Sequence, residues 1–212
     1  MRALPASTAG YLLGAKMLRA EVALKSADGK LHDFRIDRGK LVKRYSGGQL
    51  TLLERDGSKS AVKVASSAHV VLNGKFANLR NLRPGMQVAV PRDGDIPADA
   101  AYAATKTAPP IPKATVQYLL GARMLRAEVA LQTPDTTIHD YLLDRGRIRQ
   151  VAPYSLTLRE ADGSTVALSV SATVKVKLNG KTASFAQLRR GMTATVMRDG
   201  DKPADQVWAT AK

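Results

Sequence analysis

This chain of 212 residues contains the same segment twice, and the duplication limits its fold more than any other feature. The segment Tyr11–Leu24 returns as Tyr118–Leu131 with one change in 14 positions, Lys16 to Arg123. Turn motifs then recur in the same order, ending in Arg-Asp-Gly-Asp at 92–95 and 198–201. Repeats of this length are small domains rather than solenoid units. We therefore expect an N-terminal arm at 1–10, a first repeat at 11–105, a Pro-rich linker at 106–117 and a second repeat at 118–212.

Hydrophobic periodicity indicates that each repeat is mainly β-structure. Apolar residues occupy every second position from Leu18 to Leu24, which predicts a strand whose other face presents Met17, Arg19 and Glu21 to solvent. Asp-Gly at 56–57 and 162–163, and Asn-Gly at 73–74 and 179–180, predict tight hairpin turns. The helical candidates are short, at 76–82 and 184–188. This pattern predicts two homologous small closed β-barrels of OB or SH3-like type in tandem, each with one short helix.

The later two-thirds of each repeat, roughly 39–96 and 146–202, carries a further pattern. In the second repeat it runs from Asp162-Gly-Ser through Thr173 and Asn179-Gly-Lys to Leu188-Arg-Arg-Gly-Met192. The pattern resembles a group of small bacterial β-barrel domains of unknown function, usually found in secreted or envelope-attached proteins. The resemblance implies a barrel fold and an extracellular or envelope location. It carries over no catalytic residues. A cytoplasmic location is the alternative, because a nucleic-acid-associated protein would be equally basic.

The residues that usually carry catalysis are scarce. The chain has no cysteine and three histidines, so disulfides, cysteine zinc sites, iron–sulfur clusters and cysteine nucleophiles are excluded. The pairs His32-Asp33 and His139-Asp140 are adjacent, and neighbouring residues on a strand point to opposite faces, so the aspartate cannot orient the histidine. Asp93-Gly-Asp95 lacks the further oxygen ligands of a calcium loop. We therefore expect a protein that is not an enzyme, with no catalytic residue, cofactor or metal.

Positive charge is the feature that most favours a partner. Lys and Arg number 33 against 18 Asp and Glu, which gives a formal net charge of +15. A chain this basic favours polyanions such as nucleic acid, acidic polysaccharide or an envelope polymer, although a solvated surface needs no ligand. Adjacent Glu21 and Glu128 are expected to mute Arg19 and Arg126. The candidate polyanion-binding residues are Lys63, Arg159, Lys175, Lys177, Arg19 and Arg126.

The near identity of the repeated opening segment suggests a surface constraint, since packing alone tolerates exchange of one apolar residue for another. Both copies would then dock against the same partner, or one copy would pair with the neighbouring barrel. An edge strand could also extend another subunit's sheet, which would give a homo-oligomer or polymer. The alternative function is therefore a self-assembling structural subunit joined through 11–24 and 118–131. Its candidate assembly residues are Tyr11, Met17, Glu21, Tyr118, Met124 and Glu128.

No apolar run reaches the roughly 18 residues of a membrane span, so we expect no transmembrane segment. The stretch Met1–Gly10 lacks the apolar region of a signal peptide.

Overall fold

The computed structural model describes residues 4–211, most of which lie in β-strands. The first repeat contains α1 (Ala6–Leu12), β1 (Met17–Lys25), β2 (Leu31–Arg44), β3 (Gln49–Leu53), β4 (Lys59–Leu72), β5 (Lys75–Ala77), β6 (Gln87–Asp93) and β7 (Ala98–Ala104). The second contains α2 (Lys113–Leu119), β8 (Met124–Gln132), β9 (Ile138–Ala152), β10 (Ser155–Arg159), β11 (Thr165–Leu178), β12 (Lys181–Ala183), β13 (Thr193–Asp199) and β14 (Ala204–Thr210). The prediction of a mainly β fold is confirmed.

Five strands of the first repeat form a closed, mixed barrel. Antiparallel pairings lead from β2 through β3 to β4, a parallel pairing leads from β4 to β7, and antiparallel pairings return through β6 to β2. Leu50, Leu52, Val62 and Val64 lie in its core. Because successive strand residues point to opposite faces, the alternation in the sequence separates the inside of the barrel from its surface.

The strands of the second repeat pair in the same order, from β9 through β10, β11, β14 and β13 back to β9. The step from β11 to β14 is again parallel. The predicted hairpin turns are confirmed in both repeats, since the Asn and Gly of each Asn-Gly turn and the Gly of each Asp-Gly turn have positive φ. A separate apolar cluster fills this half of the molecule.

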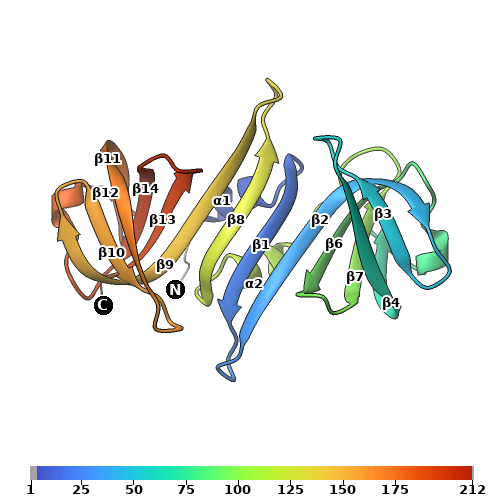
Figure 1. Cartoon of the computed structure of the whole chain (residues 1–212), viewed down its shortest axis with the longest axis horizontal. Coiled ribbons are helices and arrows are strands. Elements are labelled where there is room, and N and C mark those ends of the chain that lie inside the picture. The colour runs from blue at the N-terminus through green and yellow to red at the C-terminus, as the bar shows by residue number, and fades with distance from the viewer. Residues whose placement is uncertain (1–3, 212) are drawn as a thin grey trace.

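A tandem arrangement would suggest that the two repeats are separate in space, but they are joined. Strand β1 pairs antiparallel with β8, so one 14-stranded sheet runs through both repeats. Arg19 lies opposite Ala130, and Ala23 lies opposite Arg126, so Glu21 and Glu128 face each other at the centre of a pseudo-twofold arrangement. Figure 1 shows the four central strands β2, β1, β8 and β9 between the strand sets at the two ends.

Two helices lie against one face of the central strands, and sequence reasoning missed both. Tyr11–Ala15 was expected to begin a strand, but α1 covers Ala6–Leu12 and β1 begins only at Met17. The reason is a helical apolar face formed by Ala9, Leu12 and Leu13, which are all buried. Helix α2 repeats this arrangement across the boundary between the predicted linker and the predicted second repeat, and it packs beside α1.

The short helices expected at 76–82 and 184–188 are present only as single turns. Each site holds one 3-10 turn, at Leu79–Asn81 (η1) and Phe185–Gln187 (η2). A capping box at Asn78 and Ser184 closes each turn, and the chain is extended again at Leu82 and Leu188.

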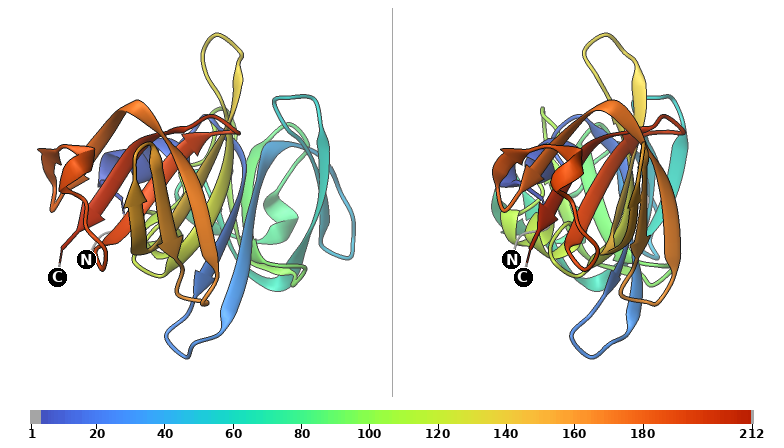
Figure 2. Two further views of the ribbon diagram at one scale, coloured as in Figure 1. Left: turned by 60° about the vertical axis from the view of Figure 1, so that its left-hand side comes forward. Right: turned by 90° about the vertical axis from the view of Figure 1, so that its left-hand side faces the viewer.

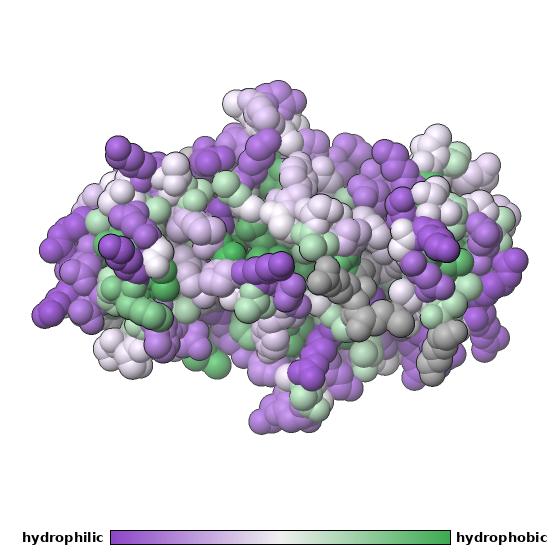
Figure 3. Space-filling model, turned by 180° about the vertical axis from the view of Figure 1, so that it is seen from behind, coloured by the Kyte–Doolittle hydropathy of each residue, from purple (hydrophilic) through white to green (hydrophobic). Residues whose placement is uncertain are grey.

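The central core joins the two repeats. It combines α1, α2, β1 and β8 with residues of β2, β9 and β13. The β1–β2 and β8–β9 hairpins project at opposite edges of the molecule (Figure 2). Seen from behind, the surface is mostly hydrophilic, and hydrophobic residues show near the middle (Figure 3).

Candidate functional site

Two of the predicted polyanion-binding residues are already neutralised within the chain. The Arg19 Nη1 atom lies 2.9 Å from Glu54 Oε2 and 2.8 Å from Asp56 Oδ2. Arg126 makes the equivalent pairs with Glu160 at 3.3 Å and Asp162 at 2.9 Å. The partners are therefore the aspartate of each Asp-Gly turn and the glutamate two residues before it, and the expected muting by Glu21 and Glu128 is wrong. Glu21 and Glu128 lie on the same strands as the two arginines, whereas the Asp-Gly turns bring acids from the barrels to Arg19 and Arg126.

Three other predicted lysines do not form one surface. Lys63 lies on β4, whereas Lys175 and Lys177 lie on β11, and all three are exposed. Strands β4 and β11 lie at opposite ends of the molecule (Figure 1). These cations therefore cannot contact one short ligand together.

The predicted assembly residues lie at the contact between the two repeats. Tyr11 packs edge-on against Tyr141 with ring centroids 6.5 Å apart, and Tyr118 packs edge-on against Phe34 at 5.6 Å. Each tyrosine thus reaches across to the other repeat. Each repeated strand has neighbours on both sides, β1 between β2 and β8, and β8 between β1 and β9. Pairing with the neighbouring repeat, one of the options that the sequence left open, is the one the structure contains.

The prediction that Met17 faces solvent is wrong. Met17 and Met124 are each 1% exposed and belong to the central core. They are the first residues of β1 and β8 and lie next to the helices. The apolar helices therefore cover two side chains that an isolated strand would expose. Glu21 and Glu128 are exposed, as expected for Glu21.

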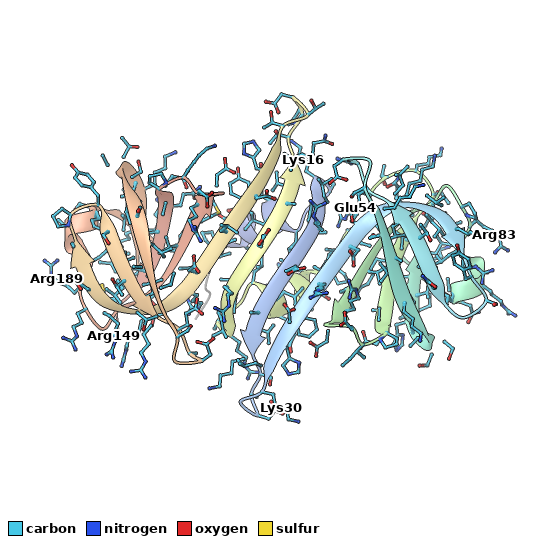
Figure 4. All side chains as sticks on the ribbon, viewed as in Figure 1. Lys16, Lys30, Glu54, Arg83, Arg149 and Arg189 are labelled. Atoms are coloured by element: carbon cyan, nitrogen blue, oxygen red, sulfur yellow. The ribbon has the colours of Figure 1, made fainter. Side chains whose placement is uncertain are left out.

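A basic groove opens where the second repeat meets the β1–β2 hairpin of the first. It has a volume of about 800 Å³. We call it the junction groove and define it by the six cationic side chains that line it: Lys25, Arg123, Arg145, Arg147, Arg149 and Arg159. Arg159 is the one residue of the six that the sequence analysis selected. Figure 4 places Arg149 low on the left, near the foot of β9.

Strand geometry concentrates three of these arginines. Arg145, Arg147 and Arg149 occupy alternate positions of β9, which is the spacing that puts side chains on one face of a strand. Arg149 falls at a register shift between β9 and β10, where Gln150 pairs with Thr157 and Ile148 with Leu158. Such bulges redirect a side chain.

Arg147 and Arg159 lie directly opposite each other on β9 and β10. Like charges opposite each other in a sheet are destabilising, so this pair favours a bound anion. Within residues 4–211, neither forms an ion pair with an acidic side chain, and the same holds for Arg149, Arg123 and Lys25.

The inner end of the junction groove is more enclosed. Arg145 Nε donates to the Ala122 carbonyl at 3.2 Å, and its Nη1 donates to Thr195 Oγ1 at 3.0 Å. Burial lowers the pKa of Arg145 below its usual value. Glu160 also lines the groove, but its Oε2 accepts a hydrogen bond from Ser164 and pairs with Arg126. Burial raises the pKa of Glu160, and the six cations outnumber this one acid in the lining of the groove.

The histidines do not form a catalytic centre with their sequence neighbours. His32 Nδ1 lies 2.5 Å from Asp93 Oδ2, and His139 Nδ1 lies 3.0 Å from Asp199 Oδ2. The rings of His32 and His139 stack on Phe34 and Tyr141. Among residues 4–211, no three metal-ligating side chains gather in a way that could hold an ion. In the same part of the chain, no helix combines the length and apolarity needed to span a membrane.

Comparison with protein-family models, curated proteins and solved structures finds no match to this chain. The resemblance to secreted barrel domains, and the location that it implies, therefore stay predictions.

One signal for the groove is visible in the sequence. The run Arg145-Gly-Arg147-Ile-Arg149 places three cations on one strand face. The matching run of the first repeat is Arg38-Gly-Lys40-Leu-Val42, which has only two. The sequence alone could not show that Arg147 lies opposite Arg159, because this depends on the register between β9 and β10.

Proposed function

We propose that this chain is a non-catalytic module that binds polyanions in the junction groove. The observation that carries the proposal is the facing pair Arg147 and Arg159, with no acidic side chain of residues 4–211 paired to either. The other groove cations extend this charge across both repeats. We further propose that the second repeat closes into a barrel like the first, since its strands pair in the same order.

The chemistry of the groove favours recognition of charge rather than of sequence. The described residues that line it include no aromatic side chain on which a base could stack. Arginines bind phosphate and sulfate oxygens through their planar fork of donors. The groove therefore suits the backbone of a nucleic acid, an acidic polysaccharide or an envelope polymer, and the location of the protein decides which of these it meets.

The test is a comparison of two triple variants that lose the same charge. The first, Arg147→Gln/Arg149→Gln/Arg159→Gln, removes three of the six cations of the junction groove. The second, Lys63→Gln/Lys175→Gln/Lys177→Gln, removes three exposed cations at the ends of the molecule. Fluorescence anisotropy would measure the binding of each to labelled single-stranded DNA, polyphosphate and a sulfated glycan of equal charge.

We expect the groove variant to lose about a hundredfold or more in affinity, because it removes three charge-assisted contacts that each contribute at least about 1 kcal/mol. The end variant should change by about threefold or less. Equal losses in both variants would mean that net charge alone attracts the ligand, and the groove would not be the site. Thermal unfolding of both variants shows whether each is folded.

Self-assembly through the repeated strand is the alternative proposal. The pairing of β1 with β8 gives that strand its neighbour within the chain, and no further observation favours pairing between chains. Sedimentation velocity at low and high salt separates the two proposals, since a polymer would persist at both.

A further inference from the structure

The first repeat contains a cavity at the position equivalent to the junction groove, but with a different interior. It has a volume of about 560 Å³ and lies between β2, the β3–β4 turn and the chain after β7. Figure 4 places Lys16 and Glu54 at the upper edge of the molecule, across from Arg149. Arg38 lines this cavity, and we call it the Arg38 cavity.

Arg38 is a buried cation with an unused hydrogen-bonding edge. The residue is 4% exposed, and its Nη1 donates to the Gly14 carbonyl at 2.8 Å. Its Nε and Nη2 have no hydrogen-bond partner among residues 4–211. These two nitrogens form one side of the planar guanidinium, the side that binds two oxygens of a phosphate, sulfate or carboxylate. An unpaired buried charge is costly, so this arrangement calls for an anion.

The second repeat holds its equivalent arginine differently. Arg145 Nε donates to the Ala122 carbonyl, and its Nη1 donates to the Thr195 hydroxyl. Arg38 donates from Nη1 to the Gly14 carbonyl, and the buried Ala89 stands in the place of Thr195. The two copies therefore differ in which nitrogens of the guanidinium are bonded among residues 4–211.

The other charges around the cavity favour an anion with more than one negative charge. Lys40, Arg55 and Lys106 line it with Arg38 and are exposed. Glu54 lines it as well, but its Oε2 is paired with Arg19. Burial, and then the nearby Arg55, lower the pKa of Arg38 to about 10, which leaves it charged at neutral pH.

We propose that the Arg38 cavity is a binding site for a tetrahedral oxyanion, phosphate or sulfate, with the guanidinium of Arg38 as its buried positive charge. Lys40, Arg55 and Lys106 supply the surrounding positive charge. The cavity is larger than an inorganic phosphate, so the same site takes the terminal phosphoryl group of a small molecule. The site is distinct from the junction groove and does not depend on the function proposed for it.

Isothermal titration calorimetry tests this with inorganic phosphate, sulfate and glycerol phosphate, at an ionic strength held constant with chloride. The wild-type chain should bind one tetrahedral anion. Arg38→Met should lose about tenfold or more in affinity, the usual effect of removing a charged hydrogen-bond donor. Lys63→Gln, which also removes one cation, should bind as the wild type does. Tighter binding of glycerol phosphate than of inorganic phosphate would identify a phosphoryl group as the preferred source of the anion.

A second variant keeps the test valid if Arg38→Met does not fold. Arg38→Lys keeps the buried charge but loses the planar guanidinium, so it should weaken phosphate binding while leaving the chain folded. The proposal is overturned if the wild-type chain gives no more heat with phosphate or sulfate than with chloride. It is also overturned if folded Arg38→Met binds phosphate as tightly as Lys63→Gln. Polyanion binding in the groove is measured separately, so either proposal can fail alone.

Discussion

Replacing Arg19 with alanine should destabilise the chain by stranding a buried carboxylate. The Glu54 side chain is 3% exposed, and Arg19 Nη1 is its ion-pair partner among the described residues. Breaking a fully buried pair costs about 3–5 kcal/mol. The Arg19 side chain is 47% exposed, and solvent screens it, so we expect a loss of about 1–3 kcal/mol.

The cost should depend on pH in a defined direction. Burial raises the pKa of Glu54, and Arg19 partly opposes that effect. Burial would raise the pKa of Asp56 too, but hydrogen bonds from Ser58 and Arg19 outweigh it and hold the value at about 2. Asp56 therefore stabilises the folded state above its unfolded pKa, and this contribution is lost as the pH falls towards 2. Both carboxyl groups make the Arg19→Ala penalty largest near neutral pH and smaller in acid.

Urea unfolding at pH 7 and pH 4 measures this, with Arg35→Ala as the matched control. Arg35 pairs with the exposed acids Glu21, Asp33 and Asp95 at 3.5–3.6 Å, and such surface pairs contribute about 0–1 kcal/mol. Equal losses for the two variants, or an Arg19→Ala loss that does not shrink at pH 4, would refute the reasoning. Arg19→Ala should also bind polyanions about as tightly as Arg35→Ala, because its charge is already used.

Three further predictions concern packing and ionisation. Gly39→Ala should cost about 1–3 kcal/mol, because the new Cβ would lie 2.5 Å from the Leu53 carbonyl oxygen, whereas Gly10→Ala in α1 meets nothing and should not destabilise; urea unfolding of both decides it. Tyr118→Ala should cost about 1 kcal/mol beyond the lost buried area by removing the edge-on contact with Phe34, and a loss no greater than that of exposed Tyr154→Ala in thermal unfolding would contradict this. Burial, and then Tyr11, raise the pKa of Tyr141 to about 12. An ultraviolet titration should show Tyr141 ionising at the highest pH, and Tyr11→Phe should lower its pKa. The stability of the folded chain should fall between about pH 10 and 12, because this tyrosine ionises first in the unfolded chain.

The sequence was sufficient for the parts of the fold that local rules control. Alternating apolar residues placed the strand from Leu18 to Leu24, and the Asn-Gly and Asp-Gly turns have the expected backbone. The helices were missed because seven-residue helices are not stable alone; buried Leu12 and Leu119 show that tertiary packing stabilises them. The β1–β8 pairing was one of three options that the repeated segment left open, and only the packing of the two copies decides among them.

The candidate site was predictable only in part, because it is formed by pairs that are distant in the sequence. Arg159 was selected as a free cation, but the role of Arg147 in the groove depends on its position opposite Arg159. Arg19 and Arg126 were expected to be muted by glutamates on their own strands, but the acids that pair with them follow β3 and β10. Charge counting identifies a basic chain, whereas register and turns decide which of its charges remain free.

The two proposed anion sites lie at equivalent positions of the two repeats. The equivalent cavities share Arg38 and Arg145, each one residue before a glycine close to the neighbouring strand. The second copy adds Arg149 and Arg159, and the Nη1 atom of its inner arginine donates to Thr195. In the first copy Arg38 donates from Nη1 to Gly14, and its Nε and Nη2 have no partner among residues 4–211. We therefore propose extended polyanions for one edge of the molecule and a single small oxyanion for the other.

The salt dependence of polyanion binding tests the central claim most directly. For single-stranded DNA, the slope of log affinity against log salt is about −0.7 for each phosphate neutralised. The account predicts that Arg147→Gln/Arg149→Gln/Arg159→Gln makes this slope shallower by about 2, while the variant of Lys63, Lys175 and Lys177 leaves it close to that of the wild-type chain. A slope unchanged by the groove variant, or reduced equally by both, would contradict binding in the junction groove.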